Sequence, residues 1–133
     1  MKNNRSLSQI FLLILAFEKF VQHMYVTYGF IVNLGGIRLA VSQDYRIFLI
    51  SGFLVGLLFL LAFILLFRGN RLSLTLLFYL ALFDFLGEFV AQGKVFITIT
   101  VSFLVAALIL IMIGTKRRSL ITSAGQAESS ESA

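Results

Sequence analysis

Four long runs of apolar residues, separated by short polar segments, account for most of the chain. They extend over residues 7–32, 47–67, 72–91 and 95–113. Each is close to or above the ~20 residues that a helix needs to cross a ~30 Å hydrocarbon core. Backbone groups in lipid must be hydrogen-bonded within their own segment, so each run is predicted to be a helix. The pattern therefore predicts an all-α integral membrane protein, a bundle of four transmembrane helices joined by short loops.

The first run differs from the other three because charged residues interrupt its middle. Lys2 and Arg5 precede an apolar stretch, as in a signal peptide, but no small-residue cleavage site follows. On insertion scales a central charge such as Glu18 or Lys19 costs ~2.5 to 3.5 kcal/mol, whereas each large apolar residue returns only ~0.3 to 0.6 kcal/mol. The hydrophobicity of this run therefore does not establish that it crosses the membrane.

The distribution of basic residues supports four spans. With four crossings, one side of the membrane holds Lys2, Arg5, Arg68, Arg71, Lys116, Arg117 and Arg118, and the other holds Arg38, Arg46 and Lys94. With three crossings the basic residues would divide about evenly. Because Lys and Arg accumulate on the cytoplasmic side, we expect both termini to be cytoplasmic, in the cell (plasma) membrane.

The organisation along the chain is a membrane domain followed by a polar tail. Residues 1–118 form the predicted four-helix domain, and residues 119–133, rich in Ser, Ala, Gly and Glu, are predicted to be a disordered cytoplasmic tail. In the outer segment 33–46, a weak alternation of apolar residues would allow a short interfacial element, but a plain loop is favoured for so short a run.

Composition excludes several classes of protein. The 59% hydrophobic content and the mean hydropathy of +0.99 exceed the range of soluble domains, which contain about 45 to 50% apolar residues. The chain has no cysteine, which excludes disulfides and thiolate chemistry. The net charge of +5 comes from residues at the ends of the apolar runs, so it predicts contact with the lipid bilayer and no nucleic-acid partner.

The polar residues inside the runs gather at one depth. At ~1.5 Å per residue, Lys19 and Asp84 both lie ~18 Å from the cytoplasmic end of their runs, and His23 and Glu88 lie ~24 Å from it. The outer half of the bundle is therefore predicted to be polar and the inner half apolar. Ionisable groups within a membrane are costly, which makes each a functional candidate. The candidate cluster is Glu18, Lys19, Gln22, His23, Asp84 and Glu88.

Helical phase indicates which of these residues share a face. Asp84 and Glu88 are one turn apart and about 40° apart in phase. On the first run, a polar stripe suits the bundle interior, and Lys19 and His23 point about 100° and 140° away from Glu18. Glu18 and His23 are therefore not expected to share a metal ion. The stripe consists of Glu18, Gln22, Tyr25, Gly29 and Asn33.

Several features allow two interpretations. Asp84 and Glu88 could form a proton or cation site, because two carboxylates a turn apart in a low dielectric cannot both ionise freely. They could instead form a structural ion pair with Lys19 or protonated His23. The histidine itself could be a packing residue or a ligand. Gly52 and Gly56 have the small-xxx-small spacing of close helix contacts.

Two functions from different classes follow. The chain lacks a phosphate-binding glycine loop, a zinc-protease motif and a nucleophile elbow, so neither an enzyme nor a cofactor is expected. The favoured function is a non-catalytic subunit or assembly partner that packs in the bilayer through the buried outer-half cluster, as a homo-oligomer or in a larger membrane complex. The alternative is a small proton- or cation-linked carrier or binding protein with an outward-facing acidic cavity.

Overall fold

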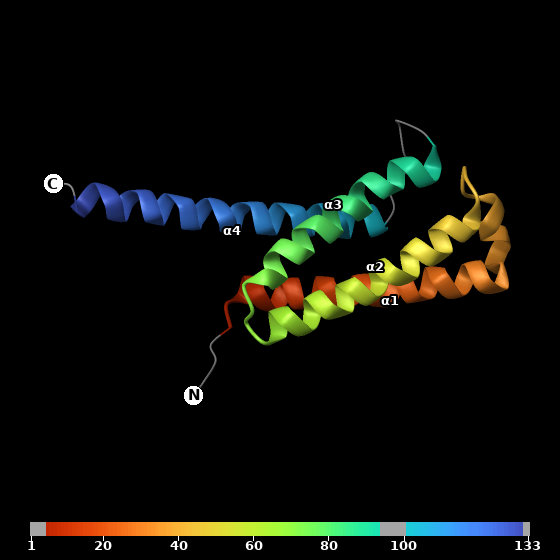
Figure 1. Ribbon diagram of the computed structural model, residues 1–133, viewed down its shortest axis with the longest axis horizontal. Coiled ribbons are helices and arrows are strands. Elements are labelled where there is room, and N and C mark those ends of the chain that lie inside the picture. Colours follow the sequence, from red (N-terminus) through yellow and green to blue (C-terminus); the bar gives the residue numbers. More distant parts are fainter. Residues whose placement is uncertain (1–4, 94–100, 132–133) are drawn as a thin grey trace.

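Within the part that the structure describes, the protein consists of helices joined by short turns and loops, without strands. The structure is a computed structural model that describes residues 5–93 and 101–131, with side chains as far as Lys116. Its elements are α1 (Leu7–Val32), the 3₁₀ helix η1 (Leu34–Leu39), α2 (Tyr45–Phe67), α3 (Leu72–Gln92) and α4 (Val101–Glu131) (Figure 1). The all-α fold class is thereby confirmed.

The four long helices contact one another in a ring. α1 packs most extensively against α2, α2 contacts α3, α3 contacts α4, and α4 returns to α1. Figure 1 shows α1 and α2 lying side by side, with α3 running obliquely from the end of α2 toward the start of α4. Apolar residues from all four helices, among them Leu12, Phe59, Leu77 and Ile109, fill the centre.

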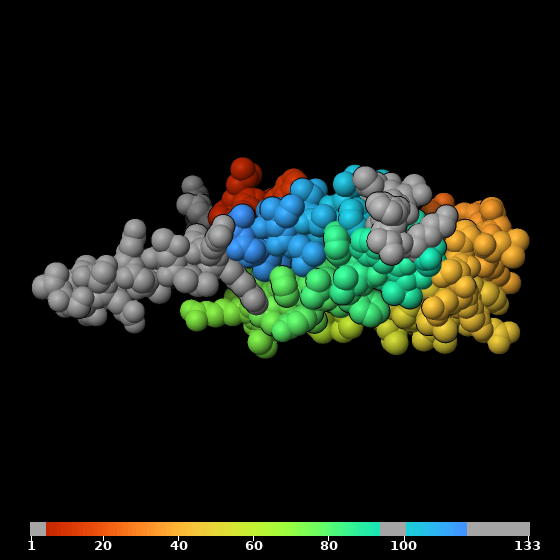
Figure 2. All heavy atoms as spheres, turned by 90° about the horizontal axis from the view of Figure 1, so that it is seen from above, coloured from red at the N-terminus to blue at the C-terminus, as the bar shows by residue number. Residues whose placement is uncertain are grey.

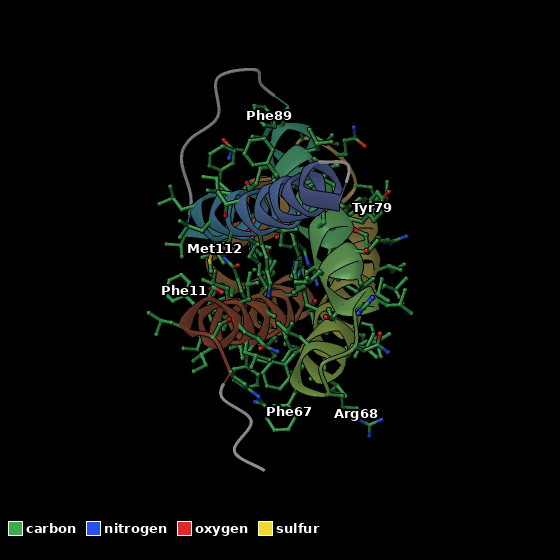
Figure 3. All side chains as sticks on the ribbon, turned by 90° about the vertical axis from the view of Figure 1, so that its left-hand side faces the viewer. Phe11, Phe67, Arg68, Tyr79, Phe89 and Met112 are labelled. Carbon is green, nitrogen blue, oxygen red and sulfur yellow. The ribbon has the colours of Figure 1, made fainter. Side chains whose placement is uncertain are left out.

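The outside of the bundle is also apolar. Phe11, Phe67 and Tyr79 are roughly half exposed or more and lie on the outside of the bundle in Figure 3. An apolar exterior over a packed interior is what a helix bundle needs in lipid. By length and composition, α1, α2 and α3 can each cross a membrane, and Val101–Lys116 is a shorter apolar segment. Lys94 and the predicted start of the fourth span lie outside the described residues.

Two arginines donate hydrogen bonds to backbone carbonyls at the two ends of the α1–α2 pair. Arg5 donates to the Phe67 carbonyl (3.0 Å) at the C-terminus of α2, and its guanidinium lies 4.1 Å from the centre of the Phe67 ring. At the opposite end, Arg38 donates to the carbonyls of Phe30 and Ile31 (2.8 Å each), the last turn of α1. Both arginines satisfy carbonyls that a helix C-terminus leaves without partners.

The outer segment between α1 and α2 contains a 3₁₀ helix where a plain loop was expected. Gly35 and Gly36 adopt positive φ angles of 61° and 75°, which glycine tolerates without strain, and they let the chain reverse tightly after α1. Further along, Ser42 donates through its N–H to Ala91 O (3.1 Å) and through Oγ to Val90 O (3.0 Å). The segment is thus hydrogen-bonded to the C-terminus of α3 at the end of the bundle that is predicted to face outward. Figure 2 shows it, in orange and yellow, gathered at one end of the molecule.

The C-terminal segment also differs from its prediction. α4 continues as a helix to Glu131, so residues 119–131 are helical and not irregular. In Figure 1 this end of α4 projects beyond the other three helices. A segment without proline that contains Ala124, Gln126 and Ala127 can extend an existing helix without tertiary contacts, because elongation needs only adequate helix propensity.

Candidate functional site

A fully buried lysine occupies the centre of the candidate cluster. The Lys19 side chain on α1 has 0% exposure. Its Nζ donates to Asp84 Oδ2 on α3 (2.5 Å), and to Ser102 O and Oγ on α4 (2.8 and 2.7 Å). An ammonium group has three donors, and all three are used here. We call Lys19, Asp84 and Ser102 the lysine network; it joins α1, α3 and α4 at one level.

The histidine completes the surroundings of Asp84. His23 Nε2 lies 3.1 Å from Asp84 Oδ1, although the two groups lack the alignment of a hydrogen bond. The imidazole ring stacks on Phe59 of α2, with 5.6 Å between ring centres. One carboxylate oxygen therefore faces the lysine and the other the histidine. This geometry matches the ion-pair interpretation of Asp84.

The inward face of α1 is not the predicted stripe. Lys19, His23 and Thr27 point into the bundle, and the Thr27 hydroxyl donates to His23 O (2.7 Å). Tyr25 is 63% exposed and Asn33 is also exposed, so placing these two inside was wrong. Helical phase alone was compatible with either of two polar faces of α1, about 100° apart, turning into the bundle. The face carrying Lys19 is the one that finds acceptors on the neighbouring helices.

The other three residues of the predicted stripe lie at the edge of this face. Gly29 is buried, as predicted, and Gln22 lines the cavity described below. Glu18 is partly buried and is not among the residues that line that cavity. Within the described part of the chain, Glu18 Oε2 and Gln22 Oε1 are enclosed without a hydrogen-bond partner. Both oxygens can still accept a bond.

A cavity of about 510 Å³ adjoins the lysine network on the side that faces segment 33–46. It lies between the halves of α1, α2 and α3 that adjoin segment 33–46, with Ser102 of α4 also in the lining, and Ile37 and Val41 of that segment contribute to its wall. Most of its lining is apolar, including Phe30, Phe48 and Val55. The polar lining residues are Gln22, His23, Ser51, Asp84, Glu88 and Ser102.

The two acidic residues of α3 both face this cavity, as their shared phase predicted. Asp84 stands at the lysine network, and Glu88 lies one turn further out, where Gln92 Nε2 donates to its Oε2 (3.3 Å). Five of the six predicted cluster residues thus lie in the lysine network or line the cavity, and Glu18 lies beside them. Ser102 was not in the predicted cluster. The sequence indicated Ser102 only as a residue with a small hydroxyl side chain at the depth of Lys19.

The other half of the bundle, away from segment 33–46, contains no buried ionisable group among the described side chains. Leu12, Leu66, Leu77 and Ile113 are each at most 3% exposed there. In the described part of the chain, no three His, Cys, Asp or Glu side chains are grouped so as to hold a metal ion. Comparison of the chain with protein-family models, curated proteins and solved structures finds no match.

Proposed function

We propose that this chain is a non-catalytic membrane protein that binds a small molecule in the cavity beside the lysine network. The observation that carries the proposal is the cavity itself. Its volume of about 510 Å³ lies within the ~300 to 1,000 Å³ that is usual for small-molecule sites. Its mostly apolar wall with a few polar groups at one end is the lining that such sites have.

The contacts of the polar cluster favour this function over that of an assembly partner. Lys19 uses all three donors within its own chain, so its ammonium group joins three helices of one bundle and has no donor left for a second protein. A homo-oligomer or larger complex would have to form through the apolar exterior. That exterior suits lipid equally well and does not single out a partner.

Binding is also favoured over transport. A carrier needs a path through both halves of the membrane, and polar groups line such paths. Here the inner half is packed with buried Leu12, Leu66 and Leu77. The cavity therefore suits a ligand that enters and leaves on the same side.

We further propose the plasma membrane as the location, with both termini cytoplasmic and the cavity in the outer half. The seven-to-three asymmetry of Lys and Arg supports this orientation. The hydrogen bond from Arg5 to Phe67 O supports only the pairing of ends that this topology requires, with the start of α1 and the end of α2 at the same end of the bundle.

The function can be tested through the ligand that accompanies the protein. Gly87 lines the cavity, and a Cβ added there meets no atom within 4 Å, so Gly87→Leu fills cavity space without a backbone clash. Gly114 on α4 has the same open surroundings and is not among the lining residues, which makes Gly114→Leu the matched control.

We expect native mass spectrometry of the protein released from lipid nanodiscs to show a bound small-molecule mass. It should be present in the wild type and in Gly114→Leu and absent from Gly87→Leu. A mass that survives Gly87→Leu, or no bound mass in any of the three proteins, would contradict the proposed function.

A further inference from the structure

We propose that the cavity binds one acyl chain of a bilayer lipid, which passes sideways between α2 and α3 while the head group stays outside the bundle. This rests on the proposed function and specifies its ligand class. Three observations carry it. The cavity opens toward the apolar exterior, segment 33–46 covers its end, and polar groups of its lining are engaged within the protein.

The side of the cavity between α2 and α3 opens on the apolar exterior of the bundle. Ile47 of α2 and Phe83, Leu86 and Val90 of α3 line the cavity and are also 53 to 56% exposed. A side chain that lines a cavity and is also half exposed stands at its opening. All four are large and apolar, so the opening adjoins acyl chains when α2 and α3 span the bilayer.

Segment 33–46 covers the end of the cavity. Ile37 and Val41 line the cavity from this segment. Arg38 and Ser42 hydrogen-bond the segment to the last turns of α1 and α3. A ligand that came from water along the bundle axis would have to displace these bonds. A chain already in the surrounding leaflet reaches the opening between α2 and α3 without displacing them.

The polar residues at the lysine network are engaged within the protein. Asp84 places one carboxylate oxygen 2.5 Å from Lys19 Nζ and the other 3.1 Å from His23 Nε2. Ser102 Oγ accepts from Lys19 Nζ (2.7 Å). His23 Nε2 and Gln22 Oε1 are enclosed and present no surface to a ligand. This end of the cavity therefore does not require a charged ligand.

Two further polar residues of the lining also bond within the chain. Glu88 Oε2 accepts from Gln92 Nε2 (3.3 Å), and Ser51 Oγ donates to Phe48 O (3.5 Å). Recognition of a ligand is therefore left mainly to the apolar wall, to which Phe48 and Val55 belong. An apolar wall selects for hydrocarbon and not for a particular head group.

A hydrocarbon chain suits such a cavity in a membrane. Water gains few hydrogen bonds from an apolar wall, and apolar cavities stay dry. Atoms that line a void lose dispersion contacts, and a chain in the cavity supplies them. Because lipid tails are as apolar as the wall, an acyl chain moves from the bilayer into the cavity without giving up polar contacts.

Photolabelling from the bilayer tests this inference on two neighbouring residues of α2. Val55 is 7% exposed and lines the cavity, whereas Leu54 is 53% exposed and is not among the lining residues. The two lie at nearly the same depth, because a helix rises only ~1.5 Å per residue. Surrounding lipid therefore reaches Leu54, and a chain in the cavity reaches Val55.

Three probes in nanodiscs separate the acyl chain of a lipid from its head group and from free fatty acid. The first is a phosphatidylcholine with a diazirine in the middle of one acyl chain, the second carries the diazirine on the head group, and the third is a fatty acid with a diazirine in its chain. Tandem mass spectrometry locates the labelled residues after illumination. We expect the first probe to label both Val55 and Leu54, and the second to label neither.

Two variants connect the labelling of Val55 to the cavity. Gly87→Leu should lower the ratio of Val55 to Leu54 labelling about tenfold or more, because the added side chain occupies the space of the acyl chain. Gly114→Leu, outside the lining, should leave the ratio unchanged. Labelling of Leu54 in every variant shows that the protein is inserted in the bilayer.

The outcomes separate this inference from the proposed function. Labelling of Val55 by the fatty acid alone would mean that the chain does not come from a bilayer lipid. Labelling of Val55 that survives Gly87→Leu would mean that it does not occur in the cavity. Either result contradicts the inference. If Val55 stays unlabelled while native mass spectrometry shows a bound mass that Gly87→Leu removes, the small-molecule site stands and the acyl chain is wrong.

Discussion

At the scale of single residues, the buried lysine determines how the polar groups are arranged. A charged side chain within a membrane is costly unless it is paired, and Lys19 meets one carboxylate and two further acceptors. Such an ion pair adds little net stability, because desolvating the charges offsets much of their attraction. Removing one partner is far more harmful, because the other charge is then buried alone.

This asymmetry predicts a specific pattern for substitutions in the lysine network. Lys19→Met should lower the free energy of unfolding by about 3 kcal/mol, because Asp84 loses its ammonium partner. The double variant Lys19→Met with Asp84→Asn should recover most of that loss, because no unpaired charge remains. Unfolding in detergent, followed by circular dichroism, measures both. The exposed Arg71→Met is the control and should be close to wild type.

A different result would change the assignment of the site. Equal losses in the single and double variants would mean that the network's hydrogen bonds to Ser102 stabilise the bundle, and not charge compensation at Asp84. No loss in Lys19→Met would mean that Asp84 is not left as a buried charge, in contradiction to the buried ion pair.

The sequence could predict most of the members of this cluster but not their arrangement. Depth along each run placed Lys19 and Asp84 at one level, and phase placed Asp84 and Glu88 on one face. Phase could not decide whether the side of α1 carrying Glu18 or the side carrying Lys19 turns inward. That depends on acceptors such as Ser102, which come from other helices and whose positions require the packed structure.

At the scale of helices, α1 and α2 pack in close contact at one glycine of α2. A Cβ added at Gly56 would lie 2.5 Å from Met24 Cε and 2.8 Å from His23 Cβ. At Gly52, one turn earlier, the nearest atom would be His23 Nδ1 at 3.8 Å. The small-xxx-small pair predicted from the sequence therefore lies inside the chain, against α1, and only its second member makes a close contact.

The two glycines should accordingly respond in opposite ways to the same change. Gly56→Ala should lower the free energy of unfolding by about 1 to 3 kcal/mol, because His23 Cβ is fixed to its backbone and cannot move aside as the Met24 methyl can. Gly52→Ala should be neutral or raise it by up to about 1 kcal/mol, since alanine favours a helix over glycine. Thermal unfolding of the two variants in one detergent compares them directly, and equal effects would contradict the packing of α1 on α2.

The helix boundaries show where sequence patterns are sufficient. The runs 7–32, 47–67 and 72–91 correspond to α1 (Leu7–Val32), α2 (Tyr45–Phe67) and α3 (Leu72–Gln92) within two residues at each end. Hydropathy determines these helices because lipid leaves an apolar segment almost no other structure. In the polar segments it carries no such constraint, and there the predictions missed η1 and the extension of α4.

At the scale of the whole molecule, the two ends of the bundle differ in charge and in construction. One end holds Arg5 on the last turn of α2 together with the α2–α3 turn, and the other holds the outer segment, the cavity and Arg38 on the last turn of α1. The basic residues are more numerous at the first end, which the positive-inside rule assigns to the cytoplasm. The side of the membrane on which the cavity lies therefore follows from the orientation of the whole bundle.

That orientation can be measured on the native chain, because it contains no cysteine. Gln43 in the outer segment and Arg68 after α2 are both exposed, so each can be replaced by cysteine without opening the core. In intact cells, a membrane-impermeant maleimide should label Gln43→Cys, and it should label Arg68→Cys only after permeabilisation. The reverse pattern would place the cavity in the cytoplasmic half. Labelling of both positions in intact cells would put them on the same side, which one crossing by α2 does not allow, and α2 would then not span the membrane.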